Sequence, residues 1–537
     1  MNRTIFKVAA LAALGMLAAA CGQNESGQST ASTAEPAATR TERQVIDTAV
    51  TALGGAERLS ALRNFTLVGY GQYAYQYGGG NITGLPGAPQ KYQAANDLKR
   101  VYDLENKRWR LQERRNFLFP FANYFGHDFN QVTQTLDGDI AYNIGADGKA
   151  VRVGKTLAIG ADGPRERRMW MLTNPVTAVR AALDPVNTVS NVRDSGAETL
   201  IDLTLQQGDK MTIAFSQQTG LPNSVAWQSP HGDLGEITYT TRFYGYLPFS
   251  GVQLPMGYTT KLDWRDIDYF KMYVNNYLVD TQLDDLAAPA AVAQTPEPVQ
   301  EFKAEITPIA QGLWRITGGT MVIEFDDHMK LFEIHGGPVR AEAVIAAAKT
   351  IKPEKPLTEL IVTHHHFDHS AGLRTAVGNG LTIISRRDNE VIFREMTSRP
   401  TPNFPDALGR NPQEMKFIPV DDTLQLKDGT STIDLYHVIN NNHMADALFG
   451  YMPQHKMTLE ADIATAAIDL QWWGDSYRDN LEYRKLEVVQ NVPVHLDVLS
   501  YADTLNLVDG GIKRVKDFCA GHLAKGTYFP GCPAAVR

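Results

Sequence analysis

Residues 363–372 read Thr-His-His-His-Phe-Asp-His-Ser-Ala-Gly and directly follow the apolar run Leu360-Ile361-Val362. A short run of branched apolar residues bounded by polar ones is typical of a buried strand. The four histidines and the aspartate therefore lie where a strand runs out into a loop, before a helix-like segment at residues 373–377. In open α/β sheets, ligand sites lie in the crevice outside the carboxyl ends of strands. The stretch predicts an α/β fold with a ligand site at this point.

The spacing of the polar residues predicts two metal ions. His364 and His366 are two positions apart, so on extended chain their side chains project to one side. Asp368 and His369 follow after the chain turns and face a second point nearby. His365 lies between two ligands, should point the other way, and is not assigned to metal. Hydrogen-bonded core histidines or a solvated histidine tract are the alternative, but neither explains this pattern abutting an apolar strand.

The pattern resembles the metallo-β-lactamase-fold hydrolases, whose signature is His-x-His-x-Asp-His. The resemblance implies a further histidine before a later strand, and residues 440–443 (Asn-Asn-Asn-His) precede the apolar run 447–453. It also implies an acidic ligand at the end of the next strand, where Asp462 stands, and a last histidine near the C-terminus, where residues 520–522 read Ala-Gly-His. The resemblance covers residues 305–537 and does not extend to the first 290 residues.

The resemblance also implies which residue binds which ion. It assigns His364, His366 and His443 to one ion and Asp368, His369 and His522 to the other, with Asp462 bridging both. Imidazole and carboxylate ligands without thiolate suit two zinc ions, although iron and manganese also accept them. Residues 333–337 read Glu-Ile-His-Gly-Gly where the family often has Asp-Thr-Gly, which predicts a looser contact to a metal ligand unless His335 replaces it. Glu460 and Asp446 are close in sequence to ligands, but are equally well read as solvated or capping carboxylates.

The expected chemistry is hydrolysis. Two metal ions that share a water lower its pKa toward neutrality and make a hydroxide nucleophile. Asp368 is well placed to accept or relay the proton as the catalytic carboxylate, and no Gly-x-Ser-x-Gly nucleophile motif competes with it. Asp462 resembles the glyoxalase-II, lactonase and phosphodiesterase branches of the family, which implies an ester, lactone or related bond as substrate. An iron-containing oxidoreductase of the same fold and a non-catalytic envelope protein that binds lipid remain the alternatives.

A substrate pocket is expected beside the segment that follows the bridging aspartate. Trp472 and Trp473 are adjacent there, and one of them is predicted to bound a pocket for an apolar or aromatic small molecule.

The first forty residues predict the compartment. Residues 1–7 form a short basic segment with Arg3 and Lys7, and the apolar stretch 8–20 is too short to span a bilayer. Residues 17–21 read Leu-Ala-Ala-Ala-Cys, which resembles a bacterial lipoprotein signal cleaved before Cys21, whose thiol would then be lipidated; an ordinary secretory signal is the alternative. Gly22 favours outer-membrane sorting, and residues 22–40 have the composition of a flexible tether. We therefore expect a periplasm-facing protein of the bacterial cell envelope that contacts the outer membrane through a lipid anchor.

The two remaining cysteines fit that compartment. Cys519 and Cys532 bracket His522, and a disulfide is the natural interpretation in an oxidising periplasm. Closing a loop of this size would restrict the unfolded chain by roughly 3 kcal/mol in the entropic model. Two unpaired buried thiols are the alternative.

The length and composition predict two domains. The 537 residues exceed the range of one core, and the Ala/Pro-rich segment 286–300 reads as a linker between residues 41–285 and 301–537. The first domain alternates apolar and polar residues between short turns, which predicts a β-rich antiparallel α+β domain, and the second should be an αββα sandwich. Turns such as Gly-Leu-Pro at 220–222 resemble those of periplasmic lipoprotein-carrier half-barrels, which implies a concave face for an acyl chain; a scaffold or dimerisation sheet is the alternative. The net charge of −9 argues against nucleic acid as a partner.

Overall fold

The computed structural model describes residues 40–76, 81–118, 130–157, 160–464 and 474–526. Cys21, Trp472, Trp473 and Cys532 lie outside these ranges, so the lipidation, the pocket tryptophans and the disulfide of Cys519 remain predictions. Residues 41–537 group into one unit, separate from residues 1–40. Among the described helices, none combines the length and the apolar character that crossing a membrane would require.

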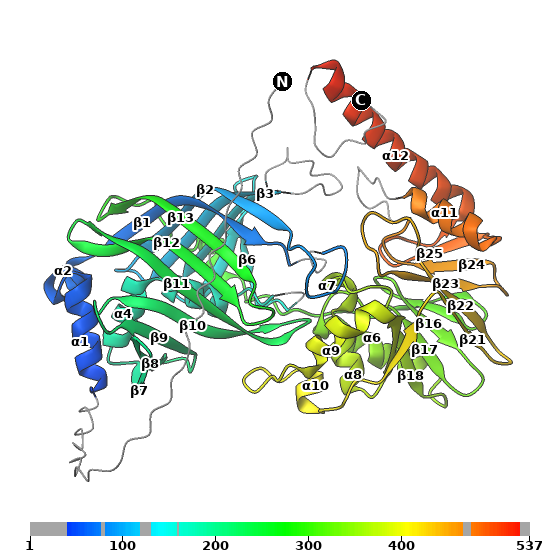
Figure 1. Cartoon of the computed structure of the whole chain (residues 1–537), viewed down its shortest axis with the longest axis horizontal. Helices are drawn as coiled ribbons and strands as arrows, with labels where there is room; N and C mark the ends of the chain where they lie inside the picture. The colour runs from blue at the N-terminus through cyan, green and yellow to red at the C-terminus, as the bar shows by residue number, and fades with distance from the viewer. Residues whose placement is uncertain (1–39, 77–80, 119–129, 158–159, 465–473, 527–537) are drawn as a thin grey trace, which may run out of the picture. The chain divides into compact units, whose positions relative to one another are not determined.

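The first part of the chain forms a 13-stranded sheet in which all paired neighbours are antiparallel (Figure 1). Its strands are β1 (Asn64–Ala74), β2 (Tyr92–Asp103), β3 (Arg108–Phe117), β4 (Asn130–Asp137), β5 (Ile140–Ile144), β6 (Ala150–Val153), β7 (Thr188–Ser195), β8 (Glu198–Thr204), β9 (Lys210–Ser216), β10 (Pro222–His231), β11 (Gly235–Phe249), β12 (Val252–Leu262) and β13 (Asp268–Val279). Two meanders, β1 to β6 and β7 to β13, are joined where β1 pairs with β13. The predicted β-rich, antiparallel character of this region is therefore observed.

Four helices pack on the sheet: α1 (Glu42–Leu53), α2 (Ala56–Ala61), α3 (Pro164–Leu172) and α4 (Pro175–Leu183). Arg167 of α3 donates to the carbonyls of Thr135 and Tyr142 on β4 and β5, while Arg165 donates to the carbonyl of Gln228 on β10. Seven strands separate β5 from β10 in the sheet order. Because one short helix reaches both, the sheet curves around it, and the helices fill much of the concave face.

The segment expected to be a linker packs along the edge of the sheet. It contains α5 (Ala290–Gln294), whose Val292 is buried. A Cβ atom on Gly154, just after β6, would lie 1.9 Å from the carbonyl oxygen of Pro298, so the two backbones touch. Residues 286–300 are therefore held by the sheet through most of their length.

The second part of the chain holds two further sheets. The 7-stranded sheet consists of β14 (Ile306–Ala310), β15 (Leu313–Ile316), β16 (Thr320–Glu324), β17 (Met329–Phe332), β18 (Leu357–Ile361), β19 (Thr382–Arg386) and β20 (Phe417–Val420). The 6-stranded sheet consists of β21 (Thr423–Lys427), β22 (Thr432–His437), β23 (Leu448–Met452), β24 (Met457–Glu460), β25 (Gln490–Pro493) and β26 (Leu499–Ser500). Apolar side chains from both sheets, such as Phe332, Ile361, Leu435 and Leu459, form one core. The chain is thus mixed α/β with large antiparallel sheets.

The second part of the chain also contains helices, which connect the strands of these sheets or follow them. They are α6 (Pro338–Ile351), α7 (Phe367–Ser370), α8 (Leu373–Gly378), η2 (Arg387–Asn389), α9 (Glu390–Ser398), α10 (Ala407–Arg410), α11 (Asp475–Arg484) and α12 (Tyr501–Ala524). Strand β18 pairs in parallel with β17 and β19 and leads into His364, and α7 begins at Phe367. The predicted order of strand, polar loop and helix is confirmed.

Candidate metal centre

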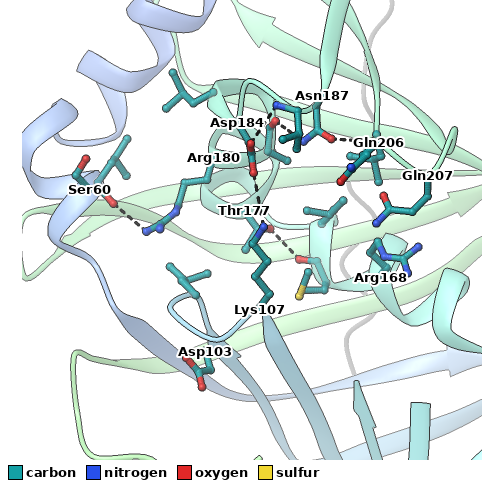
Figure 2. A pocket seen from close by; sticks show the side chains of 18 of the residues that line it. Ser60, Asp103, Lys107, Arg168, Thr177, Arg180, Asp184, Asn187, Gln206 and Gln207 are labelled. Carbon is teal, nitrogen blue, oxygen red and sulfur yellow. Dashed lines mark hydrogen bonds and ion pairs between the residues drawn. The ribbon is translucent and has the colours of Figure 1, made fainter. Parts of the chain in front are cut away.

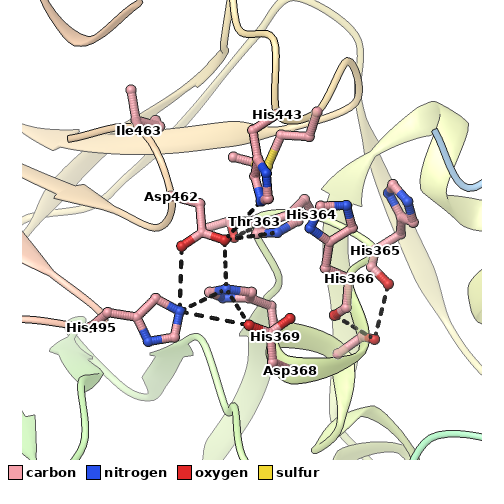
Figure 3. A network of polar contacts seen from close by, with 12 residues as sticks. Thr363, His364, His365, His366, Asp368, His369, His443, Asp462, Ile463 and His495 are labelled. Atoms are coloured by element: carbon pink, nitrogen blue, oxygen red, sulfur yellow. Dashed lines mark hydrogen bonds and ion pairs between the residues drawn. The ribbon is translucent and has the colours of Figure 1, made fainter. Parts of the chain in front are cut away.

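Two groups of potential metal ligands meet at one point, where the carboxyl ends of β18 and β24 come together (Figure 3). The first group is His364, His366, His443 and Asp462, and the second is Asp368, His369, Asp462 and His495. Within each group the ligand atoms all lie within 4.8 Å of one another. Asp462 belongs to both groups.

The carboxylate of Asp462 lies between the two groups. Its Oδ2 is 3.6 Å from His364 Nε2, 3.2 Å from His443 Nε2 and 3.1 Å from His369 Nε2. Its Oδ1 lies 3.3 Å from His495 Nε2. The Asp462 carboxylate therefore lies between the two groups, which is the placement that the predicted bridging role requires.

Local backbone contacts hold Asp462 in place. The residue follows β24 with φ of 57°, in the left-handed region that costs a side-chain-bearing residue roughly 1–2 kcal/mol. The buried carboxylate of Glu460 accepts hydrogen bonds from the backbone N–H groups of Ile463 and Ala464, at 3.0 and 3.3 Å. These bonds fix the turn on the far side of Asp462, so Glu460 is a positioning residue for the bridge.

A second turn places His443. The side-chain oxygen of Asn441 accepts hydrogen bonds from the backbone N–H groups of His443 and Met444, at 2.7 and 3.2 Å. The side chain of Met444 is fully buried, which anchors the turn in the core. The ring of His443 then lies 4.6 Å from that of His366, measured between centroids.

One predicted ligand is wrong. His522 belongs to neither group, because it lies in the last turn of α12, where its ring packs against Phe518 at 4.6 Å between centroids. His495 takes the place assigned to it, with Nε2 at 3.0 Å from His369 Nε2. A local signal for His495 was present in the sequence, because it directly follows the apolar residues 492–494 at the end of β25, much as residues 363–366 follow the apolar run after β18.

The expected loose contact near residue 333 is also wrong. The fully buried Glu333 accepts a hydrogen bond from His369 Nδ1 at 3.1 Å and another from the backbone N–H of Thr363 at 2.6 Å. It therefore orients a metal ligand, as carboxylates beside ligating histidines do. His335 does not substitute for it, since His335 Nε2 lies 2.8 Å from Arg340.

The 13-stranded sheet contributes to the centre through the loop between β1 and β2. The carbonyl oxygen of Asn81 accepts hydrogen bonds from His365 Nε2 at 3.1 Å and from His366 Nε2 at 2.9 Å. The carbonyl of Ile82 accepts one from the backbone N–H of Ala445 at 2.9 Å. A Cβ on Gly84 would lie 2.8 Å from the side chain of Ile392, so the loop approaches closely. His365 belongs to neither ligand group, and Figure 3 shows its ring away from Asp462.

The loop is itself held by an ion pair. Arg265, from the turn between β12 and β13, donates to the Gly84 carbonyl at 2.8 Å and binds Glu395 of α9 through two hydrogen bonds of 2.6 and 3.0 Å. Sequence reasoning had no signal for this arrangement, because it joins residues 84, 265 and 395, which are far apart in the chain. A second turn of the same sheet adds Asp233, whose carboxylate accepts a hydrogen bond from Ser370 Oγ at 3.1 Å.

At His369 and Asp462, burial and the neighbouring charges have opposite effects on the pKa. Burial alone would lower the pKa of His369, but the carboxylates of Asp462, Asp368 and Glu333 outweigh burial and raise that pKa well above its ordinary value. Burial would raise the pKa of Asp462, but His369 and His495 hold it well below its ordinary range. Burial lowers the pKa of His364 and of His366, with neighbouring histidines adding to the effect. His369 must lose its proton to ligate a metal ion, so metal binding here should release protons.

The donor set fits two divalent ions. His364 Nε2 and Asp368 Oδ1 are buried and have no hydrogen-bond partner among the described residues. Unpaired buried polar atoms are costly in a folded protein. A metal ion bound to each group would give His364 Nε2 and Asp368 Oδ1 a partner. Imidazole nitrogens and carboxylate oxygens without cysteine suit zinc, iron or manganese.

Comparison with known proteins gives solved structures only. No protein-family model and no curated protein matches the chain. A metallo-β-lactamase from Pontibacter korlensis is 15% identical, with 40% of this chain and 98% of that one covered and a TM-score of 0.31. A metallo-β-lactamase from Hirschia baltica is 15% identical (39% and 97% covered, TM-score 0.29), and the inverting sec-alkylsulfatase Pisa1 from Pseudomonas sp. is 13% identical (42% and 44% covered, TM-score 0.31). These structural neighbours are metallo-β-lactamase-fold proteins.

Proposed function

We propose that the protein is a dinuclear metallo-hydrolase of the metallo-β-lactamase fold, with residues 301–537 as its αββα catalytic sandwich. The observation that carries the proposal is the Asp462 carboxylate, whose Oδ2 faces His443 of the first group and His369 of the second, while its Oδ1 faces His495 of the second. Closed structural zinc sites use four ligands around one ion, whereas a shared carboxylate between two groups is suited to a pair of ions. Zinc is the proposed metal.

Different residues of the candidate centre have different proposed roles. Two bound divalent ions would supply a hydroxide nucleophile at neutral pH and polarise the bond to be cleaved. Asp368 is only partly buried, its Oδ2 lies 3.5 Å from His369 Nε2 and its Oδ1 is unpartnered, so it can receive a proton at the edge of the centre. Glu333 and Glu460 hold His369 and Asp462 in place. An ester, lactone or related bond is the proposed substrate class.

The proposed setting is the bacterial cell envelope, on the periplasmic side, with a lipid on Cys21 as the membrane anchor. It is supported by the basic residues 1–7, the apolar stretch 8–20 and the small residues before Cys21. The proposed substrate is a small apolar or aromatic molecule, for which Trp472 or Trp473 would bound the pocket.

Two measurements test the proposal. The first is the metal content per chain, by elemental mass spectrometry, and the second is hydrolysis of a panel of esters, lactones and phosphodiesters. We expect about two zinc ions per chain, turnover that a chelator removes, and loss of first-group metal and of all activity in His366→Ala. The matched control is His455→Ala, since His455 is only partly buried, belongs to neither ligand group, and its Nε2 lies 2.8 Å from the Gln311 carbonyl oxygen. Full turnover by His366→Ala would overturn the proposal, and bound iron with no hydrolysis would favour an oxidoreductase.

A further inference from the structure

A cavity separate from the metal centre lies where α1, α2, α3 and α4 meet turns of the 13-stranded sheet (Figure 2). Its volume is about 720 Å³. Small-molecule sites in proteins have volumes of roughly 300–1,000 Å³, so the space suits one ligand of moderate size. None of the residues that line it belongs to the metal centre.

The cavity and the metal centre lie at opposite ends of β2. The loop before β2 carries Asn81, whereas Asp103 at the other end of the strand lines the cavity. A strand of 12 residues spans about 36 Å at its usual rise per residue. A ligand in the cavity therefore cannot reach the metal centre, and the two sites can be tested separately.

The lining is mostly apolar. Leucines from six different elements or turns face the space: Leu59, Leu104, Leu136, Leu172, Leu183 and Leu205. Apolar surface that faces water inside a cavity is unfavourable. An apolar ligand body would cover this surface.

The basic residues that line the cavity are paired with carboxylates, with one exception, and the lining carboxylate of Asp103 accepts hydrogen bonds from Asn106. Arg43 lies 2.9 Å from Asp47, Lys107 lies 3.7 Å from Asp184, and Arg168 lies 3.4 Å from Asp209. Arg180 has no carboxylate within 4 Å in the described part of the chain. Its Nη1 donates to the carbonyls of Leu59 and Leu62, at 2.9 and 2.8 Å.

Capping of α2 uses only some of the hydrogen-bond donors of the Arg180 guanidinium. The two bonds to the α2 carbonyls use Nη1, so Nε and Nη2 keep three N–H donors with no protein acceptor in the described ranges. The side chain is about half-buried, and burial lowers its pKa because no anion compensates for it. A half-buried cation with free donors beside an apolar lining is complementary to an anionic group on an apolar ligand.

We propose that this cavity binds a single-chain amphipathic carboxylate, with its head group on Arg180 and its alkyl chain along the leucines. The carboxylate receives hydrogen bonds from Nε and Nη2 of Arg180, a geometry that the planar guanidinium favours. The neighbouring ion pairs of Lys107 and Arg168 leave the rim without further uncompensated positive charge, so one anionic group is accommodated. The proposal does not depend on the chemistry of the metal centre.

The test is saturable binding of cis-parinaric acid, a fluorescent 18-carbon carboxylate, to the purified full chain. We expect one molecule per chain, and binding about tenfold weaker in Arg180→Gln, since a hydrogen-bonded charge pair is lost. Ala181→Phe should also weaken binding because it fills the cavity. His366→Ala should bind as tightly as the wild type, which separates failure here from failure at the metal centre.

The alcohol of the same chain length provides a measurement that does not rely on a variant. The wild type should prefer the carboxylate to the alcohol, and Arg180→Gln should lose that preference. Absence of saturable binding, equal affinity of the wild type for acid and alcohol, or binding that His366→Ala removes would each overturn the proposal.

Discussion

The carbonyl oxygen of Asn81 accepts a hydrogen bond of 2.9 Å from Nε2 of His366. Since a carbonyl only accepts, the proton of the neutral imidazole lies on Nε2, and Nδ1 is the nitrogen left free for a metal ion. A residue of the loop between β1 and β2 thus selects the tautomer of a candidate metal ligand that follows β18 of another sheet. The loop between β1 and β2 therefore contributes to the candidate metal centre.

Releasing the β1–β2 loop should therefore weaken metal binding. Arg265→Ala removes the bonds to Gly84 and Glu395 that hold this loop. We expect the first-group affinity for zinc to fall about tenfold, within the range found for partners that orient metal ligands. Competition with a chromophoric chelator measures the affinity, and the absorption bands of the cobalt-substituted protein report the changed histidine geometry.

Arg242→Ala is the matched control for Arg265→Ala. Arg242 also lies on the 13-stranded sheet and pairs with a carboxylate, Glu198, at 3.2 Å, but far along the chain from the loop. The Arg242→Ala variant should bind zinc with the affinity of the wild type. Equal affinity in Arg265→Ala and the wild type would mean that the loop does not position His366.

Two histidine variants distinguish the second ligand group that the structure defines from the one that the sequence predicted. His495→Ala should lose about one of two metal ions per chain, because its Nε2 faces both His369 and Asp462. His522→Ala should retain both ions, since it lies in the last turn of α12. Elemental analysis after dialysis against a weak chelator measures the difference. Loss of metal in His522→Ala alone would restore the original assignment.

Local pattern accounts for what could be predicted from the sequence. His364, His366, Asp368 and His369 lie within six residues, so their geometry follows from one strand end and one helix start. Asp462 was identified because the family resemblance implies an acidic ligand at the end of a strand, and Asp462 lies two residues beyond β24. His495 was missed because its position depends on how β25 pairs in parallel with β24, a contact between distant segments. The Asn81 contact was missed for the same reason, since nothing near residue 81 indicates that its carbonyl faces a histidine at position 366.

Glu333→Gln should disable the second ligand group while conserving shape. The Gln amide oxygen can still accept from the Thr363 N–H, but its NH₂ group then faces His369 Nδ1, which at present donates to Glu333. A donor opposite Nδ1 favours the tautomer with its proton on Nε2, the nitrogen that faces Asp462. We expect a loss of second-group affinity of about 10–100-fold, read by isothermal titration with zinc.

Glu359→Gln is a suitable comparison for Glu333→Gln. Glu359 lies on the neighbouring strand β18 and pairs with Lys330 at 2.7 Å, away from both ligand groups. Its substitution should leave zinc binding unchanged. If Glu333→Gln also bound two ions with wild-type affinity, Glu333 would serve only to fix the backbone at Thr363.

A buried histidine should make the fold sensitive to acid where the 13-stranded sheet meets α7. Burial, with a smaller effect of Arg399, lowers the pKa of His231 to about 3. Its Nδ1 accepts hydrogen bonds from the backbone N–H groups of Asp233 and Leu234, both at 3.2 Å, and its ring contacts Phe367. In the unfolded chain the group titrates near its ordinary value of about 6.5.

The sign of the effect follows from proton binding. Between pH 6.5 and pH 3 the unfolded chain binds a proton at residue 231 that the folded protein does not, so this contribution to stability is lost as the pH falls. By pH 5 the loss amounts to about 2 kcal/mol relative to pH 8. His231→Asn retains an acceptor for the two N–H groups and cannot be protonated, so its free energy of unfolding should fall by about 2 kcal/mol less over that interval. Urea unfolding at pH 5 and pH 8, with chelator present so that metal loss does not contribute, measures the difference; identical pH dependence in the two proteins would show that His231 is not buried in its neutral form.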